Sequence, residues 1–263
     1  MAKRALCVGI NDYPVEGMDL RGCVNDANDW ATLLVEHYDF PRADVTVMLD
    51  DEATHASMLR GIEELLAGAS SGDVLVFTNS THGTYLADTD RDEPTYDEAI
   101  CPYDTEEHPL VDDELRTLFA DLPRGVRLTV LADSCHSGTV TRALPTETPD
   151  HRRVRFLNPA AIGRPVLDNP RKVKPREKYP QKDMKEVLLS GCRHNQYSYD
   201  ATIAGAPHGA FTFHAIEEIR KADYAITYAD LRARVVTALS DSNYDQEPQL
   251  EGASANLRRP VFT

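Results

Sequence analysis

The fold is indicated most clearly by Val74-Leu75-Val76-Phe77-Thr78, which leads directly into Asn79-Ser80-Thr81-His82-Gly83. Its β-branched and aromatic residues follow a turn at Ser71-Gly72-Asp73, and this pattern is typical of a strand buried inside a sheet. A second stretch repeats the arrangement, because the apolar run from Leu128 to Ala132 leads into Asp133-Ser134-Cys135-His136-Ser137-Gly138. Sites in open parallel sheets assemble at the carboxyl ends of strands, so we predict two neighbouring strands with a site at their ends.

Around these two stretches, the chain alternates between strand-like and helix-like segments. Further strands are expected over residues 5–10, 45–49 and 186–190, and helices over residues 24–38, 54–66, 115–122, 209–221 and 228–239. The alternation predicts an α/β fold with a mostly parallel central sheet flanked by helices on both faces. The length of 263 residues favours a single domain, divided into residues 1–140, a basic, proline-rich linker over residues 141–185, and residues 186–263.

Composition and charge exclude several other classes of protein. Hydrophobic residues at 41% and charged residues at 27% are typical of a globular protein. No apolar run is long enough to span a membrane and the N-terminus resembles a first strand, so we expect a cytoplasmic protein without membrane partners. The formal net charge of −15 disfavours nucleic acid as a partner. Five widely spaced cysteines without a C-x-x-C pair exclude a disulfide framework and a structural zinc site.

His82 and Cys135 are the candidate catalytic pair, because each follows a buried strand and each precedes a glycine-containing turn. A thiol is mostly protonated at neutral pH, and a nearby imidazole can take its proton and later protonate a leaving amine. The backbone amides of Gly83 and Cys135 are candidate donors to the oxyanion of the intermediate. Taken singly, a cysteine at a strand end is more often a small buried apolar residue, and a histidine in a turn is usually solvated or hydrogen-bonded.

The residues around this pair form recognisable motifs. Ser80-Thr81-His82-Gly83 and Asp133-Ser134-Cys135-His136-Ser137-Gly138 together resemble the metacaspases, the caspase-like cysteine peptidases of clan CD and family C14. Further matching segments are Val8 to Tyr13, Leu20 to Ala27, Tyr96 to Asp104, Asp112 to Leu115, Leu189 to Cys192 and Gly209 to Thr212. The resemblance covers nearly the whole chain outside the basic linker. It implies a caspase-like fold and an endopeptidase that needs no organic cofactor and cleaves protein or peptide substrates after Arg or Lys.

The resemblance also assigns roles to single residues. It implies that His82 is the general base and Cys135 the nucleophile, although Thr81 stands where the family usually has glycine. It further implies that the pocket for the residue before the scissile bond is formed by Cys23, Asp26, Ser80 and Asp133. Two carboxylates in one pocket suit Arg or Lys and repel Asp. Each carboxylate has an alternative role, Asp26 in the first turn of a helix and Asp133 as a cap in a tight turn.

Acidic residues are dense between Asp88 and Glu114, where 12 Asp or Glu residues accompany one Arg. The resemblance implies that calcium-activated members gather carboxylates that correspond to Asp97, Asp112 and Asp113, with a further Asp beyond the nucleophile. Residues 136–142 contain no Asp, so the last of these ligands is missing here. Calcium stays an expectation, and a solvated acidic surface is the alternative.

The basic linker is the second charged feature. Residues 151–185 hold 11 Lys or Arg against 3 Asp or Glu, whereas the rest of the chain is acidic. An extended basic segment close to Cys135 can enter an acidic cleft, so we expect the linker to be a substrate of the protein itself. Candidate self-cleavage sites follow Arg142, Arg152, Arg153, Arg155, Arg171, Lys172 and Lys178. The alternative is that these charges only solvate a surface loop.

Two functions stay open at this stage. The first is a monomeric cysteine endopeptidase directed at Arg or Lys. The second is a non-catalytic, caspase-like interaction module that binds basic peptide segments in the acidic pocket. Because both His82 and Cys135 are present, the sequence favours the enzyme.

Overall fold

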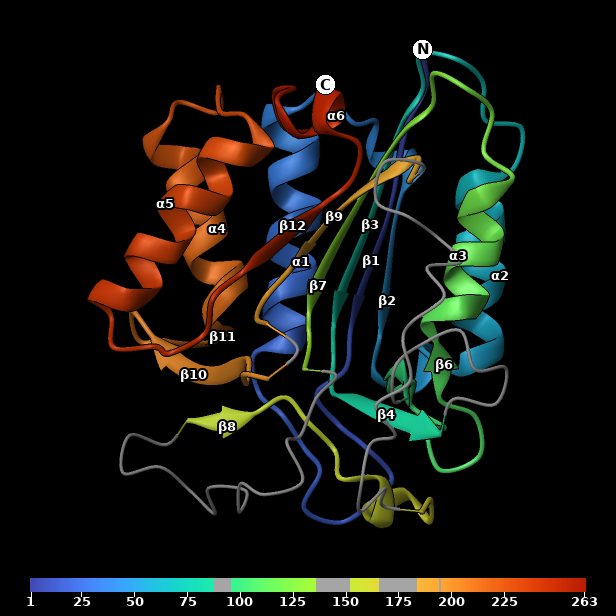
Figure 1. Ribbon diagram of the computed structural model, residues 1–263, viewed down its shortest axis with the longest axis vertical. Helices are drawn as coiled ribbons and strands as arrows, with labels where there is room; N and C mark the ends of the chain where they lie inside the picture. The colour runs from blue at the N-terminus through green and yellow to red at the C-terminus, as the bar shows by residue number, and fades with distance from the viewer. Residues whose placement is uncertain (88–95, 136–151, 166–183, 194) are drawn as a thin grey trace.

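The computed structural model describes residues 1–87, 96–135, 152–165, 184–193 and 195–263. A six-stranded sheet with the order β12-β9-β7-β3-β1-β2 forms its centre (Figure 1). The strands are β1 (Lys3–Gly9), β2 (Val45–Leu49), β3 (Val74–Ser80), β7 (Arg127–Asp133), β9 (Glu186–Ser190) and β12 (Gln249–Glu251). Only β12 pairs antiparallel among them. The predicted α/β fold with a mostly parallel sheet is confirmed.

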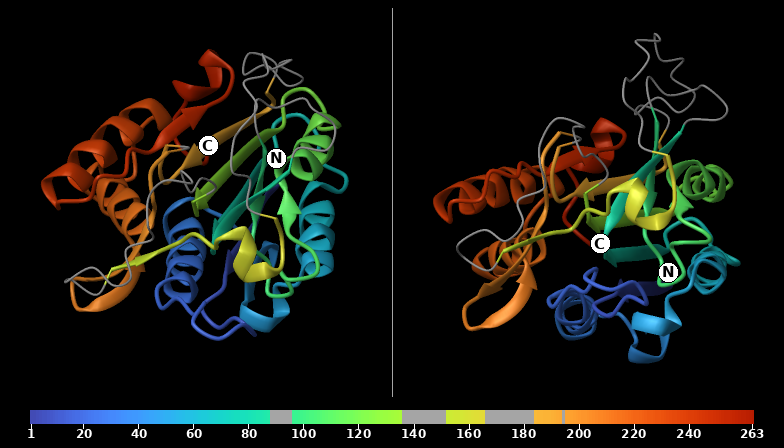
Figure 2. Two further views of the ribbon diagram at one scale, coloured as in Figure 1. Left: turned by 60° about the horizontal axis from the view of Figure 1, so that its bottom comes forward. Right: turned by 90° about the horizontal axis from the view of Figure 1, so that it is seen from below.

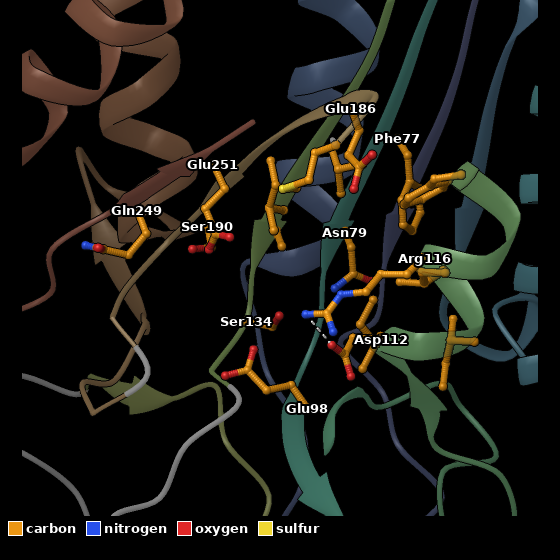
Figure 3. Close-up of a pocket in the computed structure, with 18 of the residues that line it drawn as sticks. Phe77, Asn79, Glu98, Asp112, Arg116, Ser134, Glu186, Ser190, Gln249 and Glu251 are labelled. Atoms are coloured by element: carbon orange, nitrogen blue, oxygen red, sulfur yellow. Dashed lines mark ion pairs between the residues drawn. The ribbon is translucent and has the colours of Figure 1, made fainter. Parts of the chain in front are cut away.

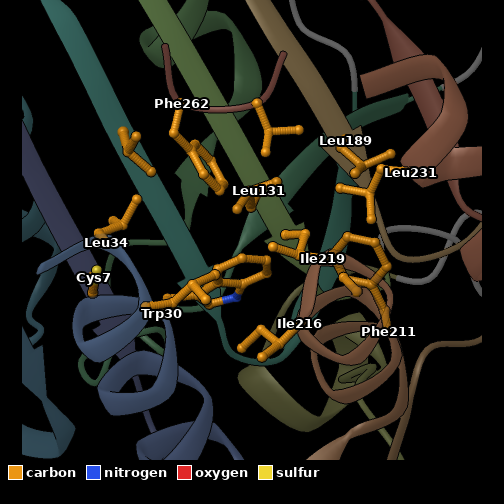
Figure 4. Close-up of a cluster of buried hydrophobic side chains, with 14 of the residues drawn as sticks. Cys7, Trp30, Leu34, Leu131, Leu189, Phe211, Ile216, Ile219, Leu231 and Phe262 are labelled. Atoms are coloured by element: carbon orange, nitrogen blue, oxygen red, sulfur yellow. The ribbon is translucent and has the colours of Figure 1, made fainter. Parts of the chain in front are cut away.

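Helices cover both faces of this sheet, as expected (Figure 1). One face carries α1 (Cys23–His37), α4 (Ala210–Lys221) and α5 (Tyr228–Asp241), and the other carries α2 (His55–Leu66) and α3 (Asp112–Ala120). On the first face, Trp30, Phe211 and Phe262 pack between the helices and the sheet (Figure 4). Short helical turns are η1 (Arg42–Asp44), η2 (Asp50–Glu52), η3 (Pro159–Ile162) and α6 (Ser254–Leu257). The apolar side chains between the helices and each face of the sheet are buried, and this burial stabilises the central sheet.

Two small sheets lie at the end of the molecule where the parallel strands end (Figures 1 and 2). The first contains β4 (Gly83–Ala87), β5 (Tyr96–Ile100) and β6 (Leu110–Val111). The second contains β8 (Arg153–Val154), β10 (Tyr199–Ile203) and β11 (Ala206–Gly209). Because the reactive strand ends face these sheets, the fold places the candidate site between the central sheet and its two small neighbours.

Part of the region expected as a linker is built into the fold. Residues 153–154 form β8 and residues 159–162 form η3. Arg155, Phe156, Leu157 and Ile162 are buried. This differs from a surface linker because apolar side chains and one paired cation anchor the segment. No helix in the described part of the chain is both long and apolar enough to cross a membrane.

Candidate active site

The two candidate catalytic residues follow adjacent strands. β3 and β7 pair in parallel with Ser80 opposite Asp133, and His82 and Cys135 each come two residues after this pair. Both side chains are buried. Both residues therefore follow the carboxyl ends of neighbouring strands, as expected, and their role as a catalytic pair stays a prediction.

The His82 ring is held in one orientation. Its Nε2 lies 2.7 Å from the carbonyl oxygen of Met18, and Tyr13 packs on the ring with the centroids 5.2 Å apart. That bond makes Nε2 the protonated nitrogen, and the buried Nδ1 has no hydrogen-bond partner among the described residues. Burial lowers the pKa of His82 to about 3, and the guanidinium of Arg155 acts in the same direction. His82 is therefore a neutral base at neutral pH, with Nδ1 available for proton transfer.

Thr81, the departure from the family pattern, fits the turn without strain. The φ angle of Thr81 is not positive, so a β-branched residue adopts this backbone conformation readily. Its Oγ1 donates to the carbonyl oxygen of His82 at 2.8 Å and accepts from Asn79 Nδ2 at 3.0 Å. The threonine therefore supports the loop that carries His82.

Cys135 contacts the other side of the site. The backbone N–H of Ser198 donates to Sγ, and Sγ lies 3.4 Å from the Ser198 carbonyl oxygen. Cys192 packs in the same apolar cluster. Within the described residues no hydrogen bond joins Sγ to His82, so proton transfer between the two groups stays a prediction.

The decisive feature is Arg155, which is fully buried inside the candidate specificity pocket. Its guanidinium pairs with three carboxylates, at 2.7 Å for Asp26, 3.3 Å for Asp133 and 3.4 Å for Asp200. It also donates to Ser80 Oγ at 2.6 Å. Three of the four expected pocket residues thus contact one arginine of the chain itself.

The backbone around Arg155 lies in the site as an extended peptide. The Arg155 carbonyl oxygen accepts hydrogen bonds from the amides of Gly83 at 3.0 Å and Cys135 at 3.1 Å, the two candidate oxyanion donors. The Arg155 N–H donates to Ser198 O at 3.0 Å, and β8 pairs antiparallel with β10. On the other side, the Leu157 N–H donates to Gly83 O at 2.9 Å. The backbone of Arg155 is therefore held on both sides by main-chain hydrogen bonds while its carbonyl oxygen lies on the two amides.

Comparison with known proteins agrees with this geometry. Residues 3–144 match the family described as metacaspase, peptidase C14 domain. Metacaspase-1A of Neurospora crassa is 32% identical over 95% of this chain and 63% of its own length. Metacaspase-4 of Arabidopsis thaliana is 43% identical over 52% of this chain and 34% of its own length. The chain belongs to the metacaspase family. It spans less than two thirds of either relative.

Solved structures support the fold of this metacaspase. A Geobacter sulfurreducens protein of 27% identity superimposes with a TM-score of 0.75 and covers 100% of this chain and 99% of its own. Caspase-1 from Spodoptera frugiperda, at 13% identity, has a TM-score of 0.58 over 95% of this chain and 86% of its own. The second likeness shows the caspase-like fold alone.

Electrostatics in the metacaspase pocket depend on the Arg155 guanidinium. Burial alone would raise the pKa of Asp26, but Arg155, with His208 and Ser80, lowers it below its usual value. The Asp26 carboxylate, 3.6 Å from His208 Nδ1, raises the pKa of His208, and burial opposes it. Cys23 borders the same pocket, where burial raises the pKa of its thiol. Burial raises the pKa of Asp133 and Arg155 opposes that rise, so the guanidinium favours the ionised carboxylates in this buried acidic pocket.

From the sequence, Asp200 and Gly209 were not assigned to the pocket, although Gly209 begins the matching segment Gly209 to Thr212. Asp200 Oδ2 accepts the backbone N–H groups of Arg21 at 3.1 Å and Gly22 at 2.8 Å, which aims its carboxylate at Arg155. No motif marks Asp200, and only the pairing of β10 with β8 brings it in. Gly209 matters for its size, because a Cβ there would overlap the Asp133 carboxylate and come within 2.5 Å of Arg155 Nη1.

The other candidate cleavage residues that the structure describes lie outside the pocket. Arg152 packs over the Tyr244 ring at 4.1 Å from its centroid, and Arg153 donates to the carbonyl oxygen of Asp19. The positions outside the described residues are Arg142, Arg171, Lys172 and Lys178. Of the three described candidates, Arg155 alone lies in the pocket.

The expected calcium carboxylates do not form a metal site in the described residues. Asp97 lies on β5, while Asp112 and Asp113 open α3. Arg116 pairs with Asp112 at 2.7 Å and lies 3.7 Å from Asp113, so a guanidinium already neutralises both. No group of three or more ligating side chains occurs in the described part of the chain. The described residues therefore show no assembled calcium site, and calcium binding stays a prediction.

A cavity of about 420 Å³ lies on the α3 face of the sheet beside the active site (Figure 3). Apolar residues such as Phe77 and Leu115 line it together with Ser134 and Cys192, the neighbours of Cys135. None of the three carboxylates that pair with Arg155 lines it. The cavity is thus separate from the arginine pocket.

Proposed function

We propose that this metacaspase is a cysteine endopeptidase that cleaves after Arg, and also after Lys, and that it cleaves its own Arg155–Phe156 bond. One observation carries the proposal. Arg155 places its side chain in the acidic pocket and its carbonyl oxygen on the amides of Gly83 and Cys135. This is the arrangement of a peptidase with substrate bound before cleavage.

The chemistry is acyl transfer. Cys135 loses its proton to the neutral His82 and attacks the carbonyl carbon of Arg155, forming a C–S bond. The amides of Gly83 and Cys135 stabilise the oxyanion, since their nitrogens already lie 3.0 and 3.1 Å from that oxygen. The C–N bond to Phe156 then breaks, and His82 gives the proton to the leaving amine. Water hydrolyses the thioester and restores the thiol.

Specificity follows from charge. Three carboxylates face a guanidinium that donates to Ser80 as well, so an arginine side chain satisfies the pocket in several directions. A lysine ammonium carries the charge but lacks the planar fork, so we expect slower cleavage after Lys. An Asp side chain would add a fourth carboxylate to the pocket and is excluded.

The bound segment also explains how the site is controlled. While Arg155 occupies the pocket, no other arginine side chain can enter it, so the uncut chain is closed to substrates. Cleavage converts residue 155 into a chain end that can leave. The basic segment therefore acts first as an inhibitor and then as a substrate, and Arg155→Ala is expected to be active on peptides without processing.

Turnover of fluorogenic peptides tests the proposal. We compare cleavage of three reporter peptides by the wild type, Cys135→Ala and Cys7→Ala. The residues before the reporter are Val-Arg, Val-Lys or Val-Asp. Cys7 is a buried thiol in β1, away from the site, and is the matched control. We expect release after Arg and Lys that is lost in Cys135→Ala and kept in Cys7→Ala. Binding of the Arg peptide without release by the wild type would favour the non-catalytic interaction module instead.

A further inference from the structure

Phe156, on the leaving side of the scissile bond, occupies a formed pocket of its own. It is 6% exposed. Its ring is stacked on Tyr85, with centroids 6.0 Å apart and planes at 18°, and lies 6.2 Å from the ring of Tyr197. Cys135 and Cys192 belong to the same buried cluster. The residue after the bond is thus held by two aromatic rings directly beside the nucleophile.

Both tyrosines are fixed to the reacting groups. Tyr85 lies on β4, two residues after the oxyanion donor Gly83. Tyr197 precedes Ser198, whose backbone contacts Cys135 Sγ and accepts the N–H of the residue before the bond. Because each tyrosine is close in sequence to a residue that contacts the scissile bond or the nucleophile, a side chain between them has a fixed position relative to Cys135.

The backbone beyond Phe156 is held as well. Gly83 O accepts the Leu157 N–H at 2.9 Å, and Thr84 Oγ1 donates to the Leu157 carbonyl oxygen at 2.8 Å. These bonds use no side-chain atom of the bound peptide, so they align any sequence in the same extended register. Selection on this side of the bond must then come from the side-chain pocket.

We propose that Tyr85 and Tyr197 form a specificity subsite for an aromatic residue immediately after the scissile bond. The preferred substrates are then peptides with an Arg-Phe or Arg-Tyr bond, not arginine peptides in general. This inference rests on the proposed endopeptidase function. Aromatic pairs in offset or tilted contact add to the burial of the ring, so Phe is favoured over a small residue.

Internally quenched peptides of the form Val-Arg-X-Leu test the subsite, with X as Phe, Tyr, Leu or Gly. For the self-processed wild type we expect kcat/KM for Phe to exceed that for Gly by about tenfold or more, the usual effect of filling an apolar pocket. Tyr197→Ala should bring the Phe-to-Gly ratio close to one, and Tyr197→Phe should preserve it. Tyr224→Ala, which alters a tyrosine stacked on His37 away from the site, is the matched control and should keep the ratio.

The outcomes separate the two claims. Cleavage of all four peptides at equal rates would overturn the subsite and leave cleavage after Arg intact. A ratio that stays high in Tyr197→Ala would also overturn it. Failure of every Arg peptide to be cut would overturn the proposed function and the subsite together.

Discussion

Removing the Arg155 guanidinium should destabilise the uncut protein measurably. In a Cys135→Ala background, Arg155→Met keeps the length of the side chain but leaves Asp26, Asp133 and Asp200 without their buried cation. Loss of one partner from a buried ion pair costs about 3–5 kcal/mol. For a chain of this size, a loss of about 1 kcal/mol in the free energy of unfolding lowers Tm by about 2–4 °C. The variant should therefore melt at least about 6 °C lower than its parent.

Differential scanning calorimetry provides the measurement. The matched control is Arg164→Met, because Arg164 lies on the same segment and, among the described residues, donates to the carbonyl oxygen of Glu107 at 2.8 Å. This substitution should lower the free energy of unfolding by less than about 1 kcal/mol. A Val-Arg peptide should raise the Tm of Arg155→Met and leave that of the parent unchanged, since the parent pocket is full. Equal Tm values for Arg155→Met and the parent would refute the buried ion-pair argument.

Three further predictions concern the pocket and its surroundings. Gly209→Ala should abolish peptidase activity while the fold remains, because its Cβ would overlap the Asp133 carboxylate; activity and circular dichroism check this. The raised pKa of His208 means that the stabilisation it gives is complete below about pH 6.5 and is lost as pH rises through the raised value. A Tm series from pH 5.5 to 9 should therefore show less decline in His208→Gln than in its Cys135→Ala parent. Because Arg116 pairs with Asp112, chelator or millimolar calcium should leave peptidase activity unchanged; a calcium-dependent rise would contradict that pairing.

The elements and the catalytic pair could be predicted because their signals are local. The expected ranges 45–49 and 186–190 match β2 and β9, since short runs of β-branched and leucine residues favour strands even where, as in β2, Val45 alone is buried. His82 and Cys135 stand directly after such runs, and parallel pairing brings strand ends together. Both features depend only on neighbouring residues.

The choice of Arg155 among seven basic candidates could not be predicted. Asp26, Asp133 and Asp200 meet only in the folded chain, from α1, β7 and β10. Phe156 and its tyrosine neighbours are likewise brought together by tertiary pairing. Local sequence patterns carry no information about such contacts.

The start of α3 was predicted three residues too late. The sequence interpretation began this helix at Leu115, but it begins at Asp112. Acidic residues favour the first turn of a helix, and the Glu114 side chain accepts the N–H of Val111 at 3.2 Å. The prediction that Asp112 and Asp113 bind calcium stays open, but their position at the helix start and their pairing with Arg116 give both residues a structural role as well.

The most direct test of the central claim is the mass and N-terminal sequence of the fragments that the purified protein makes of itself. The wild type and Cys135→Ala are incubated side by side and sampled over time. We expect the wild type to separate into residues 1–155 and 156–263, with Phe156 as the new N-terminus, while Cys135→Ala stays whole. A wild type that remains one chain while it cleaves Arg peptides, or whose first cut falls after another basic residue, would contradict the account.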